Sequence, residues 1–196
     1  MKVAIVSTGI ANIASVQAAF KRLNVDSFLT ADADEVRHAG HVMLPGVGAF
    51  GPGMAKLREH GLDEALQERA ANDMPLMAIC LGLQLLGVSS EETPGVIGLK
   101  IHSSSAHRFS EDVRVPHFGW NEVVPDEGMR FIQRGFAYFA NSFRLTEAPE
   151  GWKVGWTQYD GRFPAAIERG NVLACQFHPE LSGEWGLELM RRWTSC

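Results

Sequence analysis

The sequence has few cysteines, no long apolar run and no block of like charges, and each absence excludes a class of protein. Its three cysteines are too few and too widely spaced for a disulfide framework, which favours a reducing compartment and hence the cytoplasm. No stretch approaches the roughly 18 apolar residues of a membrane helix, and the first apolar run is too short for a secretion signal. The formal net charge is −5 and no run of Lys or Arg exceeds two residues, so nucleic acid and membrane surfaces are poor partners.

The histidines and cysteines also lack the spacing of a metal site. Cys175 and His178 form one C-x-x-H pair, and His102 lies near His107, but neither pair has the second pair that zinc requires. We therefore expect no metal and no cofactor. The remaining composition, 196 residues of which 45% are hydrophobic and 21% charged, is typical of one soluble domain spanning residues 1–196.

The first half of the chain alternates short apolar strands with segments of helical periodicity. Strands are predicted at 3–6, 25–29, 42–44 and 76–79, with helices over about 13–23, 32–38 and 54–72, the last interrupted near Gly61. This pattern indicates a parallel sheet covered on both faces, in which ligands bind at the carboxyl ends of the strands. From about residue 96 to 174, short runs rich in Val, Phe, Trp and Tyr predict antiparallel strands that extend the sheet. The predicted fold class is α/β, with a largely parallel central sheet, an antiparallel extension and helices on both faces.

Cys80 lies where a predicted strand, 76–79, meets a predicted helix, 81–86. A sharp turn there lifts the sulfur out of the sheet, and the helix N-terminus favours the thiolate and offers N–H groups to an oxyanion. A cysteine after an apolar run is more often a plain core residue. Gly82 and Gln84, in the first helical turn, favour the catalytic interpretation.

The tripeptide His178-Pro179-Glu180 supplies a base and a carboxylate. A residue before proline is held extended, so we expect His178 at the end of a strand over 172–177. Residues two apart in an extended segment point to the same side, which places Glu180 beside the imidazole and leaves the other ring nitrogen free to face a thiol. An isolated H-P-E string is weak evidence. Together with Cys80 it predicts a nucleophile, a base and an orienting carboxylate.

These motifs resemble those of a class I (triad) glutamine amidotransferase, and within that class the glutaminase subunit of imidazole glycerol phosphate synthase from histidine biosynthesis. The class is indicated by the I-C-L-G-x-Q-L-L elbow, the P-G-V-G loop at 45–48 and H-P-E at 178–180. The subunit is indicated by residues 8–12 with 15–16, by Ser90-Glu91-Glu92, by residues 138–143 and, most specifically, by P-H-F-G-W-N at 116–121. The resemblance implies a flavodoxin-like fold and hydrolysis of L-glutamine to glutamate and ammonia through a glutamyl thioester.

The resemblance also implies residue roles. Cys80 attacks the carboxamide carbon, His178 transfers protons and Glu180 orients His178. The oxyanion hole takes the N–H of Leu81 and one from Val47 or Gly48. The residues that bind glutamine are Gly46, Gln84, Glu92 and Ser142. Ammonia passes to a cyclase subunit with a (β/α)₈ barrel, in a heterodimer whose interface lies at or near Asn12, Ser15, His117, Trp120 and Asn121.

Two stretches depart from the family's usual pattern. Residues 8–13 read T-G-I-A-N-I where Tyr-Gly-x-Gly-Asn-Leu is usual, and Asn141 and Phe143 replace the usual His and Tyr on either side of Ser142. Two alternatives stay open. One is the glutaminase of another synthase, such as that making pyridoxal phosphate, although its Gly-Gly-Glu-Ser motif is absent from this sequence. The other is a non-catalytic, regulatory glutaminase-like subunit, against which the complete triad argues.

Overall fold

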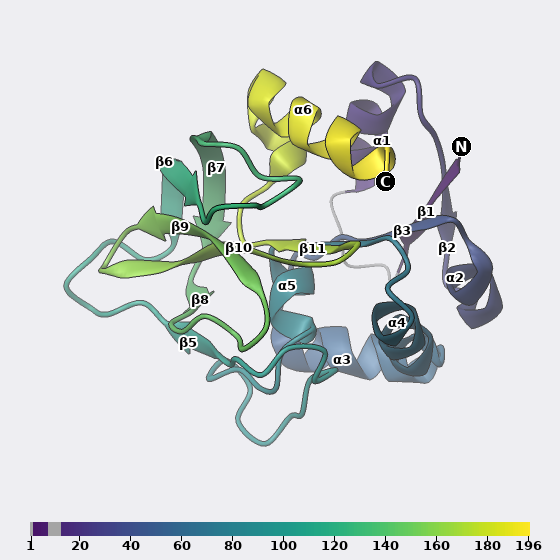
Figure 1. The fold of residues 1–196 in the computed structure, drawn as a ribbon. Helices are drawn as coiled ribbons and strands as arrows, with labels where there is room; N and C mark the ends of the chain where they lie inside the picture. Colours follow the sequence, from purple (N-terminus) through teal and green to yellow (C-terminus); the bar gives the residue numbers. More distant parts are fainter. Residues whose placement is uncertain (1, 8–12) are drawn as a thin grey trace.

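The computed structural model describes residues 2–7 and 13–196. Five adjacent strands of its central sheet run parallel to one another: β1 (Lys2–Val6), β2 (Asp26–Thr30), β3 (His41–Leu44), β4 (Leu76–Ile79) and β11 (Val172–Cys175). Four antiparallel strands extend it: β10 (Arg162–Arg169), β9 (Lys153–Gln158), β6 (His117–Pro125) and β7 (Gly135–Asn141). The order across the sheet is β2-β1-β3-β4-β11-β10-β9-β6-β7 (Figure 1). A separate antiparallel pair joins β5 (Ala106–Arg108) to β8 (Phe143–Leu145).

Helices cover both faces of the parallel part. Helices α1 (Ile13–Arg22) and α6 (Gly183–Thr194) lie on one face, and α3 (Phe50–Glu59), α4 (Leu62–Ala71) and α5 (Leu81–Leu85) lie on the other (Figure 1). The short helix α2 (Ala33–His38) follows β2, and a 3₁₀ helix, η1 (Pro179–Leu181), precedes α6. Among the residues described, no helix is long and apolar enough to cross a membrane.

Successive residues of one strand pack into different hydrophobic clusters, which explains the continuous apolar runs. On β1, Val3 and Ile5 belong to the cluster that includes Phe20 of α1 and Trp193 of α6. Ala4 and its neighbours on the opposite face join the cluster formed with α3, α4 and α5. Both clusters consist of almost fully buried side chains, so a polar residue on either side of these strands would be desolvated. The predicted α/β fold with a parallel core and an antiparallel extension is confirmed.

The long helical stretch predicted over 54–72 is two helices that meet at Gly61, whose φ of 64° requires the left-handed conformation that glycine adopts without strain. Helix α3 begins at Phe50, earlier than predicted. The reason lies far away in the sequence: a carboxylate oxygen of Glu92 accepts the Phe50 N–H at 2.6 Å, and the hydroxyl of Thr93 accepts that of Gly51 at 3.2 Å. A cap supplied by a remote loop leaves no local signal.

Arg69 is a charged residue buried in this core, with 1% of its surface exposed. Its guanidinium donates to five backbone carbonyls, those of Val36, Arg37, Ala39, Gly40 and Pro75, at 2.6–3.3 Å. Burial lowers its pKa to about 10, so the group stays charged at neutral pH. Several of these carbonyls belong to the last turn of α2, where a cation is also favoured by the helix dipole. Arg69 therefore ties the end of α2 to the starts of β3 and β4.

Arg69→Met should lower the free energy of unfolding by about 3 kcal/mol or more, because methionine fills the space but leaves several buried carbonyls without donors. Urea denaturation followed by circular dichroism measures the change. Arg37→Met is the matched control, since that arginine pairs with Asp34 and Glu68 at the surface and its loss should change little. Equal effects of the two substitutions would contradict the role given to Arg69.

Candidate active site

The sheet topology brings three separate segments to one edge. Strands β3, β4 and β11 are neighbours and parallel, and Cys175 pairs with Ile79 in the β4–β11 register. Their carboxyl ends therefore lead into the loop 45–48, into Cys80 and into the segment 176–178. Ligands of parallel α/β sheets bind at this edge.

Cys80 has the strained backbone of a nucleophile elbow. Its φ of 53° and ψ of −107° lie in a region that side chains other than glycine rarely occupy, and its N–H donates to the Cys175 carbonyl at 2.7 Å. Helix α5 starts at the next residue, as predicted. The cysteine is 8% exposed, so the sulfur is shielded by protein yet reachable from a cavity.

His178 and Glu180 meet as the sequence predicts, but by a different geometry. The Nδ1 atom of His178 lies 2.9 Å from a carboxylate oxygen of Glu180, and both side chains are buried. His178 is extended, with φ of −102° and ψ of 96°. The predicted strand over 172–177 ends at Cys175, however, and Glu180 lies in the 3₁₀ helix η1. The carboxylate is brought back to the imidazole by this turn, not by the side-to-side alternation of an extended chain.

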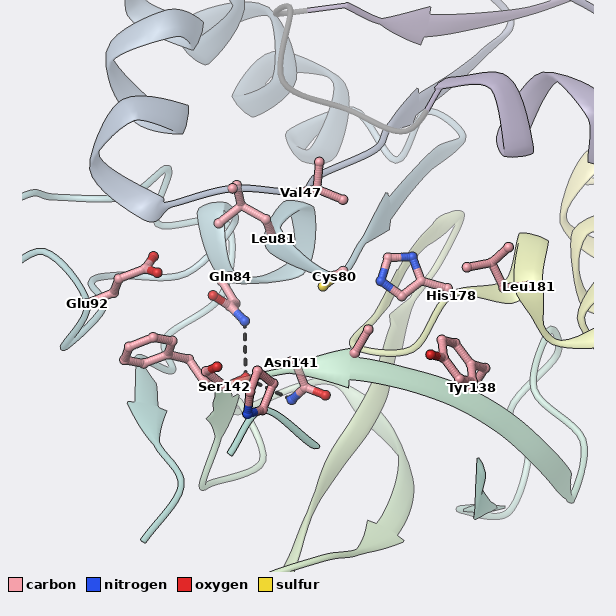
Figure 2. A pocket seen from close by; sticks show the side chains of 14 residues that line it. Val47, Cys80, Leu81, Gln84, Glu92, Tyr138, Asn141, Ser142, His178 and Leu181 are labelled. Carbon is pink, nitrogen blue, oxygen red and sulfur yellow. Dashed lines mark hydrogen bonds between the residues drawn. The ribbon is translucent and has the colours of Figure 1, made fainter. Parts of the chain in front are cut away.

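The imidazole of His178 faces Cys80 with its other nitrogen (Figure 2). Burial by itself lowers the pKa of His178, but hydrogen bonds to Cys80 and Glu180 and the charges of these two groups raise the pKa to about 10. His178 therefore carries a proton at neutral pH and presents it beside the sulfur. A histidine in this form can protonate a leaving group at the nucleophile.

The loop 45–48 packs directly on the elbow. The Leu81 N–H, a predicted oxyanion donor, donates to the carbonyl of Gly46 at 3.3 Å. Val47 and Gly48 line the adjacent cavity, and Gly48 has a φ of 104°, which favours glycine. Gly46, predicted among the substrate-binding residues, does not line this cavity. A Cβ at Gly46 would lie 2.6 Å from the Gly82 nitrogen, so this position allows the loop and the elbow to touch.

A cavity of about 400 Å³ opens beside the Cys80 sulfur (Figure 2). The predicted glutamine-binding residues Gln84, Glu92 and Ser142 all line it. Gln84 donates its amide hydrogens to the carbonyl of Phe143 at 3.2 Å and to the side-chain oxygen of Gln176 at 3.1 Å. One carboxylate oxygen of Glu92 accepts the Phe50 N–H at the start of α3. Within the part of the chain that the structure describes, the side-chain oxygen of Gln84 and the other oxygen of Glu92 have no hydrogen-bond partner.

A model of the glutamine amidotransferase class-I family matches residues 5–193. The chain is 37% identical over 195 residues to imidazole glycerol phosphate synthase subunit HisH of Oceanobacillus iheyensis, with 97% of each chain covered. It is 43% identical over 194 residues to subunit HisH of Methanopyrus kandleri, covering 97% of this chain and 96% of the relative. The chain belongs to the class I glutamine amidotransferases, in their HisH family.

Solved structures agree with this assignment at the level of the fold. A crystal structure of a glutamine amidotransferase superposes on this one with a TM-score of 0.80 at 20% identity, covering 98% of this chain and 97% of the other. The structure of PurLQS from Thermotoga maritima gives a TM-score of 0.77 at 17% identity, and the match covers 99% of this chain and 97% of the other. The family resemblance predicted from the motifs is confirmed.

Several residues of this amidotransferase's site are absent from the sequence prediction. Tyr138, Ala140 and Asn141 of β7 form one wall of the cavity. The Asn141 side chain donates to the Phe143 carbonyl at 3.0 Å, and within the described structure its oxygen is buried without a partner. Gln176 is fully buried beside Cys80. The sequence held a signal for Gln176, because the predicted strand over 172–177 places it two positions before His178 and so on the same side.

The residues predicted at the partner interface are spread over different environments. Asn12 lies outside the described residues, and Ser15 is half-buried on α1. Trp120 is 54% exposed, and Asn121 donates to the Gln158 carbonyl at 2.6 Å.

His117, predicted at or near the interface, is 2% exposed in this chain. Its ring stacks on Tyr159 at 3.8 Å between centroids and bonds to Asn121 at 3.0 Å, so it packs beneath the face that carries Trp120. Among the described residues, no group of three or more His, Cys, Asp or Glu could hold a metal ion.

Proposed function

We propose that this amidotransferase hydrolyses L-glutamine at Cys80 and supplies the ammonia to imidazole glycerol phosphate synthase in histidine biosynthesis. One observation carries the proposal: Glu180, His178 and Cys80 form a continuous buried chain of contacts that ends at the sulfur beside a cavity. The chain has the order carboxylate, imidazole, nucleophile that acyl transfer requires.

In the first half of the reaction the Cys80 thiolate attacks the carboxamide carbon of glutamine. A C–S bond forms, and the carbonyl π electrons move to oxygen to give a tetrahedral oxyanion. His178 then donates its proton to the amide nitrogen, the C–N bond breaks and ammonia leaves. Glu180 keeps the imidazole oriented and stabilises its charge throughout.

In the second half His178, now neutral, takes a proton from water as the oxygen attacks the thioester. The C–S bond breaks, glutamate leaves, and the proton on His178 restores the thiolate–imidazolium pair. The oxyanion of each half-reaction needs N–H donors in place before it forms. We assign these to Leu81 and to Val47 or Gly48, which surround the sulfur on the loop side of the cavity.

Substrate recognition follows from the charges around the cavity. The free oxygen of Gln84 suits an N–H of the substrate, because its amide hydrogens are already used within the protein. The free oxygen of Glu92 suits the α-ammonium group of glutamine. We assign Ser142, on the loop between β7 and β8, to the same binding site.

The cavity opens next to an apolar surface that fits a partner subunit. Phe118, Trp120 and Phe136 are 61%, 54% and 58% exposed, and the β6–β7 register places them on the same side as Tyr138 and Ala140 of the cavity wall. Exposed aromatic residues in one patch are typical of protein interfaces. We propose that a cyclase subunit with a (β/α)₈ barrel covers this surface in a cytoplasmic heterodimer and receives the ammonia.

The isolated chain should be a poor glutaminase that accelerates when the cyclase and its ligand bind. The Leu81 N–H is engaged by the Gly46 carbonyl, so one oxyanion donor must be released, and rotation of a peptide in the loop 45–48 achieves this. One missing donor costs roughly 10²–10³-fold in rate. Gly48 tolerates such a rotation better than a residue with a side chain.

Glutamate release by the chain alone, by the complex and by the complex with cyclase ligand measures this effect. Equal rates under all three conditions would contradict the proposed activation by the partner, but they would not contradict the glutaminase activity. No glutamate release under any of the three conditions would overturn the proposed function itself.

A further inference from the structure

Gln176 is a buried polar side chain beside the nucleophile that the triad mechanism does not use. None of its surface is exposed, and its side-chain nitrogen lies 3.6 Å from the Cys80 sulfur, within hydrogen-bond range for sulfur. Its backbone N–H donates to the Ala165 carbonyl at 2.7 Å, which fixes the segment between β11 and His178. A buried amide at this position is costly unless each of its groups finds a partner.

The surrounding hydrogen bonds determine which end of the Gln176 amide faces the sulfur. The carbonyl of Phe143 only accepts, so the Gln84 nitrogen must point toward it. The same nitrogen donates its second hydrogen to the Gln176 side-chain oxygen at 3.1 Å. With its oxygen committed to Gln84, Gln176 must present an N–H to Cys80.

We propose that Gln176 is a further catalytic residue, whose amide N–H stabilises the Cys80 thiolate and holds it in the orientation for attack. A sulfur anion accepts a hydrogen bond more strongly than a neutral thiol, so the contact favours the reactive form. The amide is neutral and does not titrate, so it takes no part in proton transfer, which stays with His178. This role rests on the assignment of Cys80 as the nucleophile.

The same chain of amides links the thiolate to the glutamine-binding wall. Phe143 lines the cavity, and its carbonyl accepts from both Gln84 and Asn141. Gln84 in turn holds Gln176. The position of the sulfur is therefore set from the wall that contacts the substrate as well as from His178.

The test is the pH dependence of Cys80 alkylation by iodoacetamide, from about pH 5 to pH 10, in the complex with the cyclase. A Cys196→Ser background removes the exposed cysteine, and Cys175 is fully buried. Gln176→Met keeps the length of the side chain and removes the N–H. Gln67→Met is the matched control, because it deletes an amide hydrogen bond to the Leu99 carbonyl away from the site.

Gln176→Met should raise the midpoint of alkylation by about one pH unit or more and lower kcat by about 10–100-fold. Gln67→Met should move neither quantity. An unshifted midpoint in folded Gln176→Met protein would overturn the proposal. Absence of alkylation or turnover at Cys80 in the parent protein would instead overturn the nucleophile assignment.

Gln176→Glu provides a second variant should the methionine substitution prevent folding. The carboxylate still accepts from Gln84, but it offers no N–H to the sulfur and repels a thiolate. The alkylation midpoint should rise at least as far as in Gln176→Met. A midpoint equal to that of the parent would count against the proposal in the same way.

Discussion

Cys80→Ala should lose glutamine hydrolysis by about 10⁶-fold while the fold and the partner's ammonia-dependent reaction remain. The reason is that the sulfur forms the covalent bond to the substrate, and among the described residues no second thiol lines the cavity. Glutamate release by the complex measures the loss, and synthesis with added ammonium salt measures what remains.

Cys196→Ser is the control for this substitution, because that cysteine lies at the exposed end of the chain and should leave the rate unchanged. Two outcomes of the Cys80 experiment differ in meaning. Retained glutaminase activity would contradict the nucleophile assignment. Loss of the ammonium-dependent reaction as well would indicate that the variant no longer folds or no longer binds its partner.

His178→Ala should lose about 10⁶-fold in turnover, and Glu180→Gln should lose less, about 10⁴-fold, as is usual for the base and the orienting carboxylate of a triad. His178 moves a proton in both half-reactions, whereas Glu180 orients and stabilises the imidazolium from 2.9 Å. Steady-state rates of glutamate release measure both. If Glu180→Gln were as inactive as His178→Ala, Glu180 would have a larger role than orientation.

Glu180→Gln should also lower the pKa of His178. Burial pushes this pKa down, and the bonds and charges of Cys80 and Glu180 together raise it to about 10, so removing the carboxylate leaves one of the two groups that raise it. A raised folded-state pKa contributes stability that is fully present below about pH 6.5 and is lost as the pH rises through about 10. The variant should therefore lose less stability over that interval than the parent. NMR titration of the imidazole and urea denaturation at several pH values measure the two effects.

The sequence by itself determined the elements that depend on local patterns. Apolar runs and helical periodicity gave the parallel half of the sheet, because each strand there is buried on both sides. The position of Cys80 at a strand-to-helix turn and the contact of His178 with Glu180 were also predictable, since Cys80 follows an apolar strand and His178 precedes a proline. Strand ends were less predictable. Strand β11 ends at Cys175, because the next backbone N–H groups donate to other segments: that of Gln176 to the Ala165 carbonyl and that of His178 to the Tyr138 carbonyl.

Only the tertiary structure decided how these pieces meet. The order β3-β4-β11 is not written in any one segment, yet it brings the loop 45–48, Cys80 and His178 to one edge of the sheet. The cap that Glu92 places on α3 and the burial of His117 beneath Trp120 also depend on residues far apart in the chain. The orientation of the Gln176 amide is the sharpest case. It follows from a network through Gln84 and Phe143, and such a network exists only when the whole fold has placed its members within hydrogen-bond distance.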